Sequence, residues 1–250
     1  MPTVDVRRNL AIEEAIFWSN QSVTVRLWEN QRSVIIGRGQ YAQFETDLDY
    51  CMANKIPVVR RFTGGGTVYN GPGDVNWSFF VTSAVESGMV RFERGVREIF
   101  RMASAVVVAA LKRLGIIAWL DEPNRILTAE GKVSGMAAFL TRDRLLCHGT
   151  LLLNADLVEA QLLTKPRELP VESRYVRSRP AGMANLGVEA DAFAKALGEV
   201  LSAHHGVAPA WKGEVEIVES ELADELMSKY NSQSWNLGDP FEVAGRDGSS

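Results

Sequence analysis

The sequence has little of what marks secreted or membrane-bound proteins. Among its 250 residues there are only two cysteines, Cys51 and Cys147, which lie too far apart to form the framework of a small disulfide-rich domain. No apolar run is long enough to span a membrane. The N-terminus lacks the basic segment and apolar run of a signal peptide. These absences predict a cytoplasmic protein without a membrane partner.

The sequence also lacks an excess of positive charge. Its 27 lysines and arginines are outnumbered by 31 aspartates and glutamates, which gives a net charge of -4 and a pI near 5.5. This balance argues against nucleic-acid binding, which usually relies on a basic surface. Hydrophobic residues make up 46% of the chain, enough for the core of one large domain. We expect that domain over residues 1–240 and a flexible polar tail over residues 241–250.

Hydrophobic periodicity predicts strands interleaved with helices. Alternating apolar residues indicate strands, and apolar residues at helical spacing indicate helices. Strands are predicted over residues 22–27, 34–36, 56–60, 76–81, 125–128, 132–138 and 145–154. Helices are predicted after a cap at Asn9, over residues 47–54, 92–114, 191–204 and 219–230, and up to Leu163 after a cap at Asn154 or Asp156.

Residues 164–179 are charged and contain prolines, so this segment is predicted to be a long loop. The order of the elements around it, with some strands joined as hairpins, favours an α/β (α+β) fold. We expect a mixed β-sheet flanked by helices.

A run of three glycines carries the first chemically informative residues. Gly64, Gly65 and Gly66 let the backbone turn tightly and approach a ligand without a Cβ atom in the way. Successive N–H groups in such a loop can form an anion-binding nest. Arg60 and Arg61 stand just before the glycines, and their guanidinium groups can fork onto a carboxylate or a phosphate.

The residues after the glycine run separate it from two common nucleotide-binding motifs. No Gly-Lys-Ser/Thr sequence closes the run, so it is not a P-loop, and Tyr69 stands where the last glycine of the dinucleotide fingerprint should be. Asp74 and Asn76 follow, with side chains able to hold a metal, a ribose or a base edge. For Asp74 an ordinary turn residue is the alternative.

Two further blocks contain polar residues in predicted strands. Lys132 comes just past an expected hairpin turn at Gly131, where most lysines are simply solvated charges. Cys147 directly precedes His148, so their side chains point to opposite faces of a strand. This position favours Cys147 as a small buried hydrophobe. For His148, a site residue and a hydrogen-bonded core histidine remain equal alternatives.

Together these blocks resemble the lipoate–protein ligase A family. That family carries Arg-Arg-x-Ser/Thr-Gly-Gly-Gly-x-Val-Tyr/Phe and then Gly-Asn/Asp-x-Asn-x-Ser, which match residues 60–69 and 73–78. It also carries Gly-Arg/Lys-Lys-x-x-Gly-x-Ala, whose lysine corresponds to Lys132, and His-His-Gly-Thr-Leu-Leu-x-Asn-x-Asp-Leu, which matches residues 147–157. The chain departs from the family at Asn70 and Cys147, where histidines are usual, and at Arg125, where an acidic residue is usual.

The resemblance implies the fold shared by biotin and lipoate ligases and the activity of a lipoate–protein ligase. Lipoate and ATP would give lipoyl-AMP and pyrophosphate, and the lipoyl group would pass to a lysine of an acceptor domain. Lys132 would be the catalytic lysine, because a cation between the carboxylate and the α-phosphate offsets their repulsion.

The resemblance also implies a set of residues that bind substrate, nucleotide and metal. The expected substrate- and nucleotide-binding residues are Trp28, Arg61, Thr63, Gly64, Gly65, Gly66, Tyr69, Asn70, Asp74, Asn76, Asn124, Gly135, Ala137, His148 and Thr150. Asp74 is also the expected ligand of Mg²⁺.

The implied protein partners are the lipoyl domains of 2-oxoacid dehydrogenase complexes and the glycine-cleavage H protein. Longer family members carry a C-terminal accessory domain, which archaeal-type relatives have as a separate chain. The residues after Trp235 are too few and too polar to form that domain. We therefore expect the large subunit alone, with adenylation helped by a separate accessory subunit.

Two other functions remain open at this point. One is an ATP-independent octanoyl or lipoyl transferase that uses Cys147 as its nucleophile. The other is a non-catalytic lipoyl-binding protein, which the departures at Asn70 and Arg125 make conceivable and which the presence of Lys132 disfavours.

Overall fold

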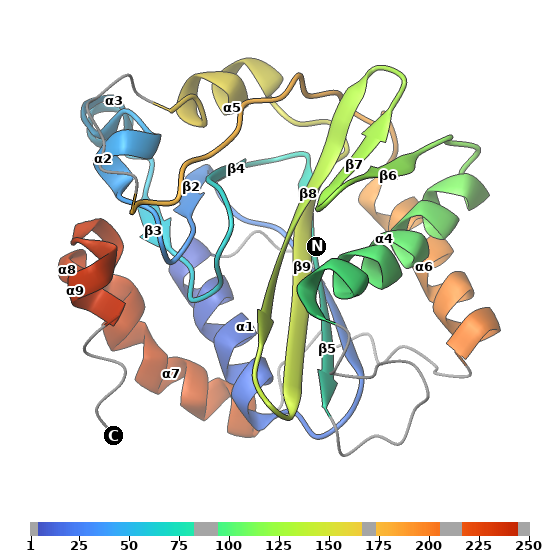
Figure 1. Ribbon diagram of the computed structural model, residues 1–250, viewed down its shortest axis with the longest axis horizontal. Coiled ribbons are helices and arrows are strands. Elements are labelled where there is room, and N and C mark those ends of the chain that lie inside the picture. The colour runs from blue at the N-terminus through green and yellow to red at the C-terminus, as the bar shows by residue number, and fades with distance from the viewer. Residues whose placement is uncertain (1–4, 83–94, 167–173, 206–216, 245–250) are drawn as a thin grey trace.

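The computed structural model describes residues 5–82, 95–166, 174–205 and 217–244 (Figure 1). Its largest element is a six-stranded antiparallel sheet in the order β1-β5-β9-β8-β7-β6. The strands are β1 (Thr24–Trp28), β5 (Asp74–Thr82), β6 (Trp119–Asp121), β7 (Arg125–Thr128), β8 (Gly131–Leu140) and β9 (Arg144–Leu152). The long pairing of β5 with β9 and of β8 with β9 makes the centre of the sheet rigid.

A second, three-stranded sheet carries the glycine run. Strand β2 (Ser33–Ile36) lies between β3 (Val58–Arg60), with which it is parallel, and β4 (Val68–Asn70), with which it is antiparallel. The glycine loop connects β3 to β4, so both of its ends are held by β2. Three short helices, α2 (Ala42–Glu45), α3 (Leu48–Ala53) and α5 (Leu157–Leu163), lie beside this sheet.

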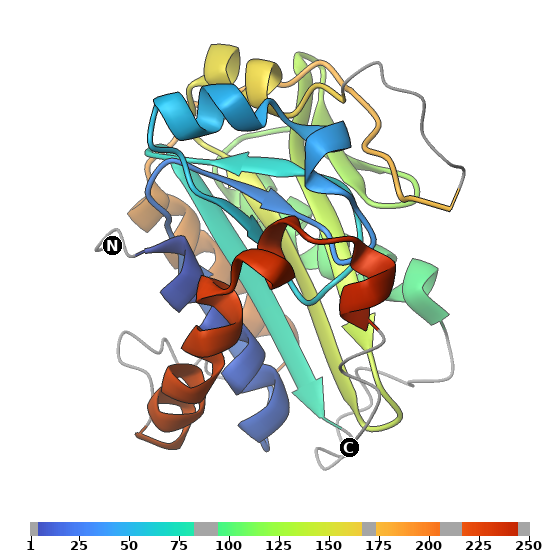
Figure 2. The same ribbon diagram turned by 90° about the vertical axis from the view of Figure 1, so that its left-hand side faces the viewer.

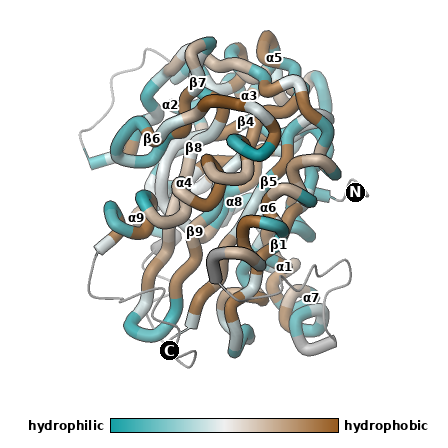
Figure 3. The backbone as a smooth tube through the Cα atoms, turned by 90° about the vertical axis from the view of Figure 1, so that its right-hand side faces the viewer, coloured by the Kyte–Doolittle hydropathy of each residue, from teal (hydrophilic) through white to brown (hydrophobic). Residues whose placement is uncertain are grey.

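Helices cover both faces of the large sheet because the strands have an apolar side chain on each face. Trp77 and Cys147 pack against α4 (Gly95–Arg113) and α6 (Ala190–His205), whereas Phe80 and Leu146 pack on the opposite face. That opposite face is covered by α1 (Val6–Ser19) and α7 (Ile217–Asn231), which lie side by side (Figure 2). Figure 3 shows that hydrophobic and hydrophilic residues occur within the same helices and strands.

The predicted fold class and the described elements are confirmed, with small shifts of their ends. The predicted cap at Asn9 is wrong, because α1 begins at Val6 and the side chain of Asp5 caps it. Asn9 lies inside the helix, where its amide donates to Glu29 and Asn30. Asp156 is the cap of α5.

Two boundary predictions are only partly covered by the structure. The expected tail begins inside a helix, because α9 (Pro240–Ala244) follows α8 (Gln233–Leu237), and residues 245–250 lie outside the described part. The first residues of the predicted helix over 92–114 also lie outside it. None of the described helices is both long and apolar enough to cross a membrane.

Candidate active site

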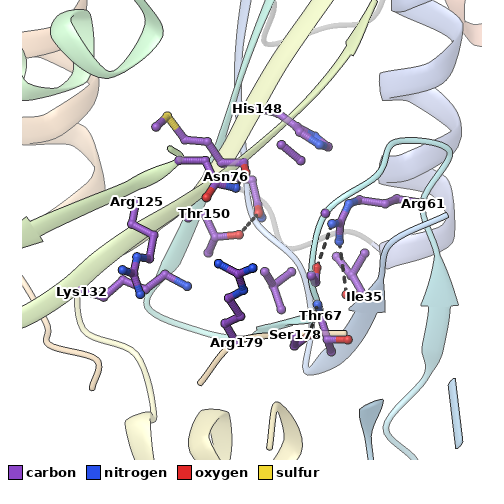
Figure 4. A pocket seen from close by; sticks show the side chains of 18 of the residues that line it. Ile35, Arg61, Thr67, Asn76, Arg125, Lys132, His148, Thr150, Ser178 and Arg179 are labelled. Carbon is purple, nitrogen blue, oxygen red and sulfur yellow. Dashed lines mark hydrogen bonds between the residues drawn. The ribbon is translucent and has the colours of Figure 1, made fainter. Parts of the chain in front are cut away.

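A pocket of about 430 Å³ is lined by residues of both sheets (Figure 4). This volume is in the usual range for a small-molecule site. The large sheet contributes residues of β1, β5, β8 and β9, and the small sheet contributes residues of β2 and β4. The glycine loop, the turn at residues 122–125, the segment at residues 176–179 and Leu10 of α1 complete the lining.

The pocket combines an apolar lining with a group of cations. Its apolar side chains include Leu10, Trp28 and Ile35. Lys132 and Arg125 lie together on the opposite side from Ile35, as Figure 4 shows. An elongated substrate with an apolar tail and an anionic end would match this distribution.

Arg61 stabilises the conformation of the glycine loop through hydrogen bonds from its guanidinium to residues of the loop. Its Nη2 donates to the carbonyl oxygens of Gly64 at 2.5 Å and Gly66 at 2.8 Å, and its Nε donates to Thr63 Oγ1 at 3.0 Å. Its Nη1 reaches the carbonyl of Ile35 at 3.4 Å. The expectation that Arg61 forks onto a substrate anion is therefore not supported, because its donors are engaged by the backbone.

Arg60 has a similar structural role outside the pocket. It is fully buried, and its guanidinium donates to the carbonyls of Arg38, Gln40, Trp235 and Gly238. It therefore ties α8 to β3, and the expectation that it binds a ligand anion is wrong. A sequence pattern does not reveal whether an arginine faces a ligand or the backbone.

Two glycines allow the loop to approach β2 closely. A Cβ atom on Gly37 would lie 2.2 Å from the carbonyl oxygen of Gly65, a distance that no side chain tolerates. Gly65 itself has φ of +89°, which L-residues rarely adopt. The backbone freedom expected of the glycine run is thus used at Gly65.

His148 is part of a buried chain of hydrogen bonds beneath the pocket. Its Nδ1 lies 2.9 Å from Glu13 Oε1, and its Nε2 lies 2.8 Å from Thr63 Oγ1. Because Arg61 already donates to Thr63 Oγ1, the Thr63 hydroxyl is free to donate to Nε2, which leaves the imidazole proton on Nδ1 facing Glu13. His148 therefore lines the pocket and is also a buried, hydrogen-bonded histidine. The two alternatives left open by the sequence, a site residue and a core histidine, do not exclude each other.

The carboxylate in this chain, Glu13, was not predicted as a site residue. It is completely buried on α1, and Ser78 also donates to its Oε1 at 2.6 Å. Although burial raises the pKa of Glu13, its interactions with His148 and Ser78 outweigh this effect and hold that pKa below its usual value. The ionised carboxylate orients the imidazole at the pocket wall.

Lys132 enters the pocket from the end of β8. Its backbone N–H donates to Gly182 and its carbonyl accepts from Ala184, whereas its ammonium has no hydrogen bond or ion pair with any residue in the described part of the chain. Burial lowers the pKa of Lys132, and the neighbouring charge of Arg125 lowers it further. A Cβ atom on Gly135 would lie 3.0 Å from Lys132 Nζ, so the glycine predicted here leaves room for the ammonium.

Most of the predicted site residues are brought together around this pocket. The lining contains Trp28, Arg61, Gly65, Gly66, Asn76, Asn124, Lys132, Gly135, Ala137, His148 and Thr150. Thr63 lies just behind the lining in its bond to His148. Gly64 is next to the lining residues, with its carbonyl turned to Arg61.

Besides Thr63 and Gly64, three more of the predicted site residues are outside the lining. Tyr69 donates to Glu159 at 2.5 Å on the far side of β4, and Asn70 bonds to Thr150 and Asn30. Asp74 is buried at the first position of β5, where its Oδ2 accepts from the Gly71 N–H at 3.0 Å. Of the three, Asn70 supports the lining directly, through its hydrogen bond to Thr150.

The geometry does not support Asp74 as a Mg²⁺ ligand. Burial raises its pKa to about 8, although the hydrogen bond from Gly71 acts in the opposite direction. No group of three histidine, cysteine, aspartate or glutamate side chains that could hold a metal occurs among the residues that the structure describes. These residues therefore do not form a resident metal site.

Several residues that line the pocket were not predicted from the sequence. They are Leu10, Ile35, Thr67, Val68, Glu122, Pro123, Arg125, Met136, Gly149, Val176, Arg177, Ser178 and Arg179. The last four come from the segment predicted as a long loop, which has no periodicity that would indicate a role.

Cys147 faces away from the pocket, as predicted from its place beside His148. It is 1% exposed in the core between β9 and α4, and burial raises the pKa of its thiol. A buried, protonated thiol is a poor nucleophile. The geometry therefore gives no support to a transferase reaction at Cys147.

We expect Cys147→Ser to keep most of the activity of this site, with a stability loss of about 1 kcal/mol from the buried hydroxyl. Cys51→Ser, which also replaces a buried free thiol, is the matched control. Activity and thermal unfolding of both variants check this expectation. An acyl adduct on Cys147, detected by mass spectrometry during turnover, would contradict it.

Comparison with known proteins connects this pocket to one family. Residues 5–202 match the model of the lipoyl protein ligase A/B catalytic domain. The chain is 30% identical over 247 residues to lipoate–protein ligase 1 of Staphylococcus aureus, covering 93% of this chain and 67% of the relative. The chain therefore belongs to the lipoyl protein ligase A/B catalytic-domain family.

Solved structures agree with this assignment. A crystal structure of lipoate–protein ligase A bound with ATP superposes with a TM-score of 0.79 at 30% identity, covering 94% of this chain and 95% of that one. A bi-partite lipoate–protein ligase from Thermoplasma acidophilum, studied with its E2 lipoyl domain, gives the same TM-score and identity over 96% and 94% of the two chains. The predicted fold and the predicted class of enzyme, a lipoate–protein ligase, are thus confirmed.

Proposed function

We propose that this protein activates lipoate with ATP and then transfers the lipoyl group to a lysine of an acceptor lipoyl domain. The observation that carries the proposal is the unpartnered Lys132 in a pocket that also has an apolar lining. Lipoate has a matching form, with an apolar chain and a carboxylate at one end. The ATP-bound relative supports the choice of nucleotide.

In the first step, a carboxylate oxygen of lipoate attacks the α-phosphorus of ATP. The bond from that phosphorus to the bridging oxygen breaks, and pyrophosphate leaves with the electron pair. Lys132, in its protonated form, lies between the two anions, offsets their repulsion and stabilises charge on the phosphorus in the transition state. Trp28, Leu10 and Ile35 would enclose the apolar chain and exclude water from it.

In the second step, the neutral amine of the acceptor lysine attacks the acyl carbon of lipoyl-AMP. The bond from that carbon to the phosphate oxygen breaks, AMP leaves with the electron pair, and the amine gives up a proton. Lys132 neutralises charge on the departing phosphate, so one cation serves both steps. The glycine loop, held by Arg61, forms one side of this space.

The residues of the pocket do not suggest a built-in metal site, so we propose that Mg²⁺ enters with the phosphates of ATP. Mg²⁺ usually binds nucleotides through phosphate oxygens and waters with few protein ligands. Glu122, a carboxylate in the lining, is engaged by Arg101. The glycine-cleavage H protein as an acceptor and a cytoplasmic location stay predictions.

We further propose that a separate accessory chain speeds adenylation. The likeness to a bi-partite ligase supports this view. We expect this protein alone to transfer lipoate from supplied lipoyl-AMP to an apo lipoyl domain, because that step needs only the pocket described above. From lipoate and ATP it should be slow, and an accessory protein should restore the rate.

Lipoylation of an apo lipoyl domain from the two donors, at equal enzyme concentration and with or without an accessory chain, tests these proposals. Transfer from neither donor would refute the proposed function. Equal and fast product formation from both donors without a second chain would refute only the need for an accessory protein.

A further inference from the structure

A short segment, residues 176–179, lines the pocket and brings to it a second cation whose side chain has no partner among the described residues. Arg179 lines the pocket, is exposed, and forms no hydrogen bond or ion pair with any other residue of the described ranges. In Figure 4 its guanidinium points toward the space beside Lys132 and Thr150. An exposed guanidinium whose donors have no protein partner is suited to binding phosphate groups.

The segment is held to the glycine loop by its neighbour, Ser178. The Ser178 hydroxyl accepts a hydrogen bond from the Thr67 N–H at 2.7 Å and another from Gln40 Nε2 at 2.9 Å. The Ser178 N–H donates to Glu45 Oε2 at 3.0 Å, and Arg177 pairs with the other oxygen of Glu45 at 2.8 Å. Glu45 is completely buried, so these contacts fix the backbone that carries Arg179.

The two unpartnered cations differ in depth, and this difference suggests different partners. Lys132 is half-buried, whereas Arg179 is exposed at the mouth. In the reaction proposed above, the carboxylate and the α-phosphate meet within the pocket, and pyrophosphate must leave through the mouth. The negative charge that develops on the leaving pyrophosphate is therefore expected close to the guanidinium of Arg179.

Building on the proposed function, we propose that Arg179 binds the β- and γ-phosphates of ATP and stabilises pyrophosphate as it leaves. We assign to Glu45 the role of a positioning residue, which acts through Ser178 and Arg177 on the placement of Arg179. When the bond between the α-phosphorus and the bridging oxygen breaks, the electron pair stays on that oxygen. The guanidinium lowers the energy of this charge. Lipoyl-AMP has no β- or γ-phosphate, so its binding does not use Arg179.

Calorimetric titration of the full chain with ATP and with chemically prepared lipoyl-AMP tests this assignment. Arg179→Gln is expected to weaken ATP binding about tenfold or more and lipoyl-AMP binding by less than about threefold. Arg179→Lys keeps the charge and should recover part of the ATP affinity. The matched control is Arg113→Gln, at an exposed arginine paired with Glu199, which should bind both ligands as the wild type does.

The role of Glu45 is tested by its coupling to Arg179. Glu45→Gln should weaken ATP binding in the wild type but have little further effect in the Arg179→Gln background, because the residue that it positions is gone. A merely structural effect of Glu45→Gln would be equal in the two backgrounds and would extend to lipoyl-AMP.

The outcomes separate this proposal from the proposed function. Equal losses for ATP and lipoyl-AMP in Arg179→Gln, or no loss for either, would overturn the assignment of Arg179 while leaving the ligase reaction intact. Failure of the wild-type protein to bind either ligand would instead refute the proposed function.

Discussion

Lys132→Ala is expected to abolish both adenylation and transfer while leaving the fold intact. Removal of a preorganised charge from an active site typically lowers a rate by about 10²–10³-fold, or about 3–4 kcal/mol. The fold should survive because the Lys132 side chain has no hydrogen bond or ion pair with another described residue, and alanine keeps the backbone hydrogen bonds to Gly182 and Ala184. Pyrophosphate release reports the first step, and acyl transfer from supplied lipoyl-AMP reports the second.

Two further variants make the Lys132 result specific. Lys132→Arg keeps the charge but replaces a compact ammonium by a larger planar group, so only partial activity is expected. Lys112→Ala, at an exposed lysine in the last turn of α4, should act as the wild type. A Lys132→Ala variant that adenylates lipoate at a near wild-type rate would contradict the assignment of this residue.

The contrast between Lys132 and the paired arginines shows what the sequence can predict. The hairpin that presents Lys132 followed from apolar alternation around a glycine turn, and the structure has that hairpin. The motif around Arg60 and Arg61 correctly located the glycine loop. However, the direction of their guanidinium groups depends on which carbonyls the fold brings near. For Arg61 these belong mainly to the glycine loop itself, and for Arg60 they include residues distant in sequence, such as Gly238.

The segment that ends at Arg179 shows the same limit in another form. It has no helical or strand periodicity, because its conformation is set by the hydrogen bonds of Ser178 to Thr67 and Gln40. Such contacts between distant parts of the chain leave no local pattern. Glu13 was missed for a related reason, because α1 reaches His148 only after the sheet has formed.

The second large effect is expected for Arg61→Lys. This variant keeps a positive charge but cannot reach Thr63, Gly64 and Gly66 together, as the guanidinium does. If Arg61 holds the loop, the loss of several charge-assisted hydrogen bonds should lower the free energy of unfolding by about 2–4 kcal/mol. Urea unfolding measures this loss, and ATP affinity should fall with it.

Arg60→Lys is the matched control because Arg60 is also buried and also donates to backbone carbonyls, but lies outside the pocket. It should lose stability to a similar extent, and its folded form should keep most of its ATP affinity. A phosphate-binding role for Arg61 predicts the reverse for Arg61→Lys, with stability close to that of the wild type and partial retention of ATP affinity through the ammonium. Since a lysine can replace the charge of Arg61 but not its geometry, the two measurements together show which of these the glycine loop requires.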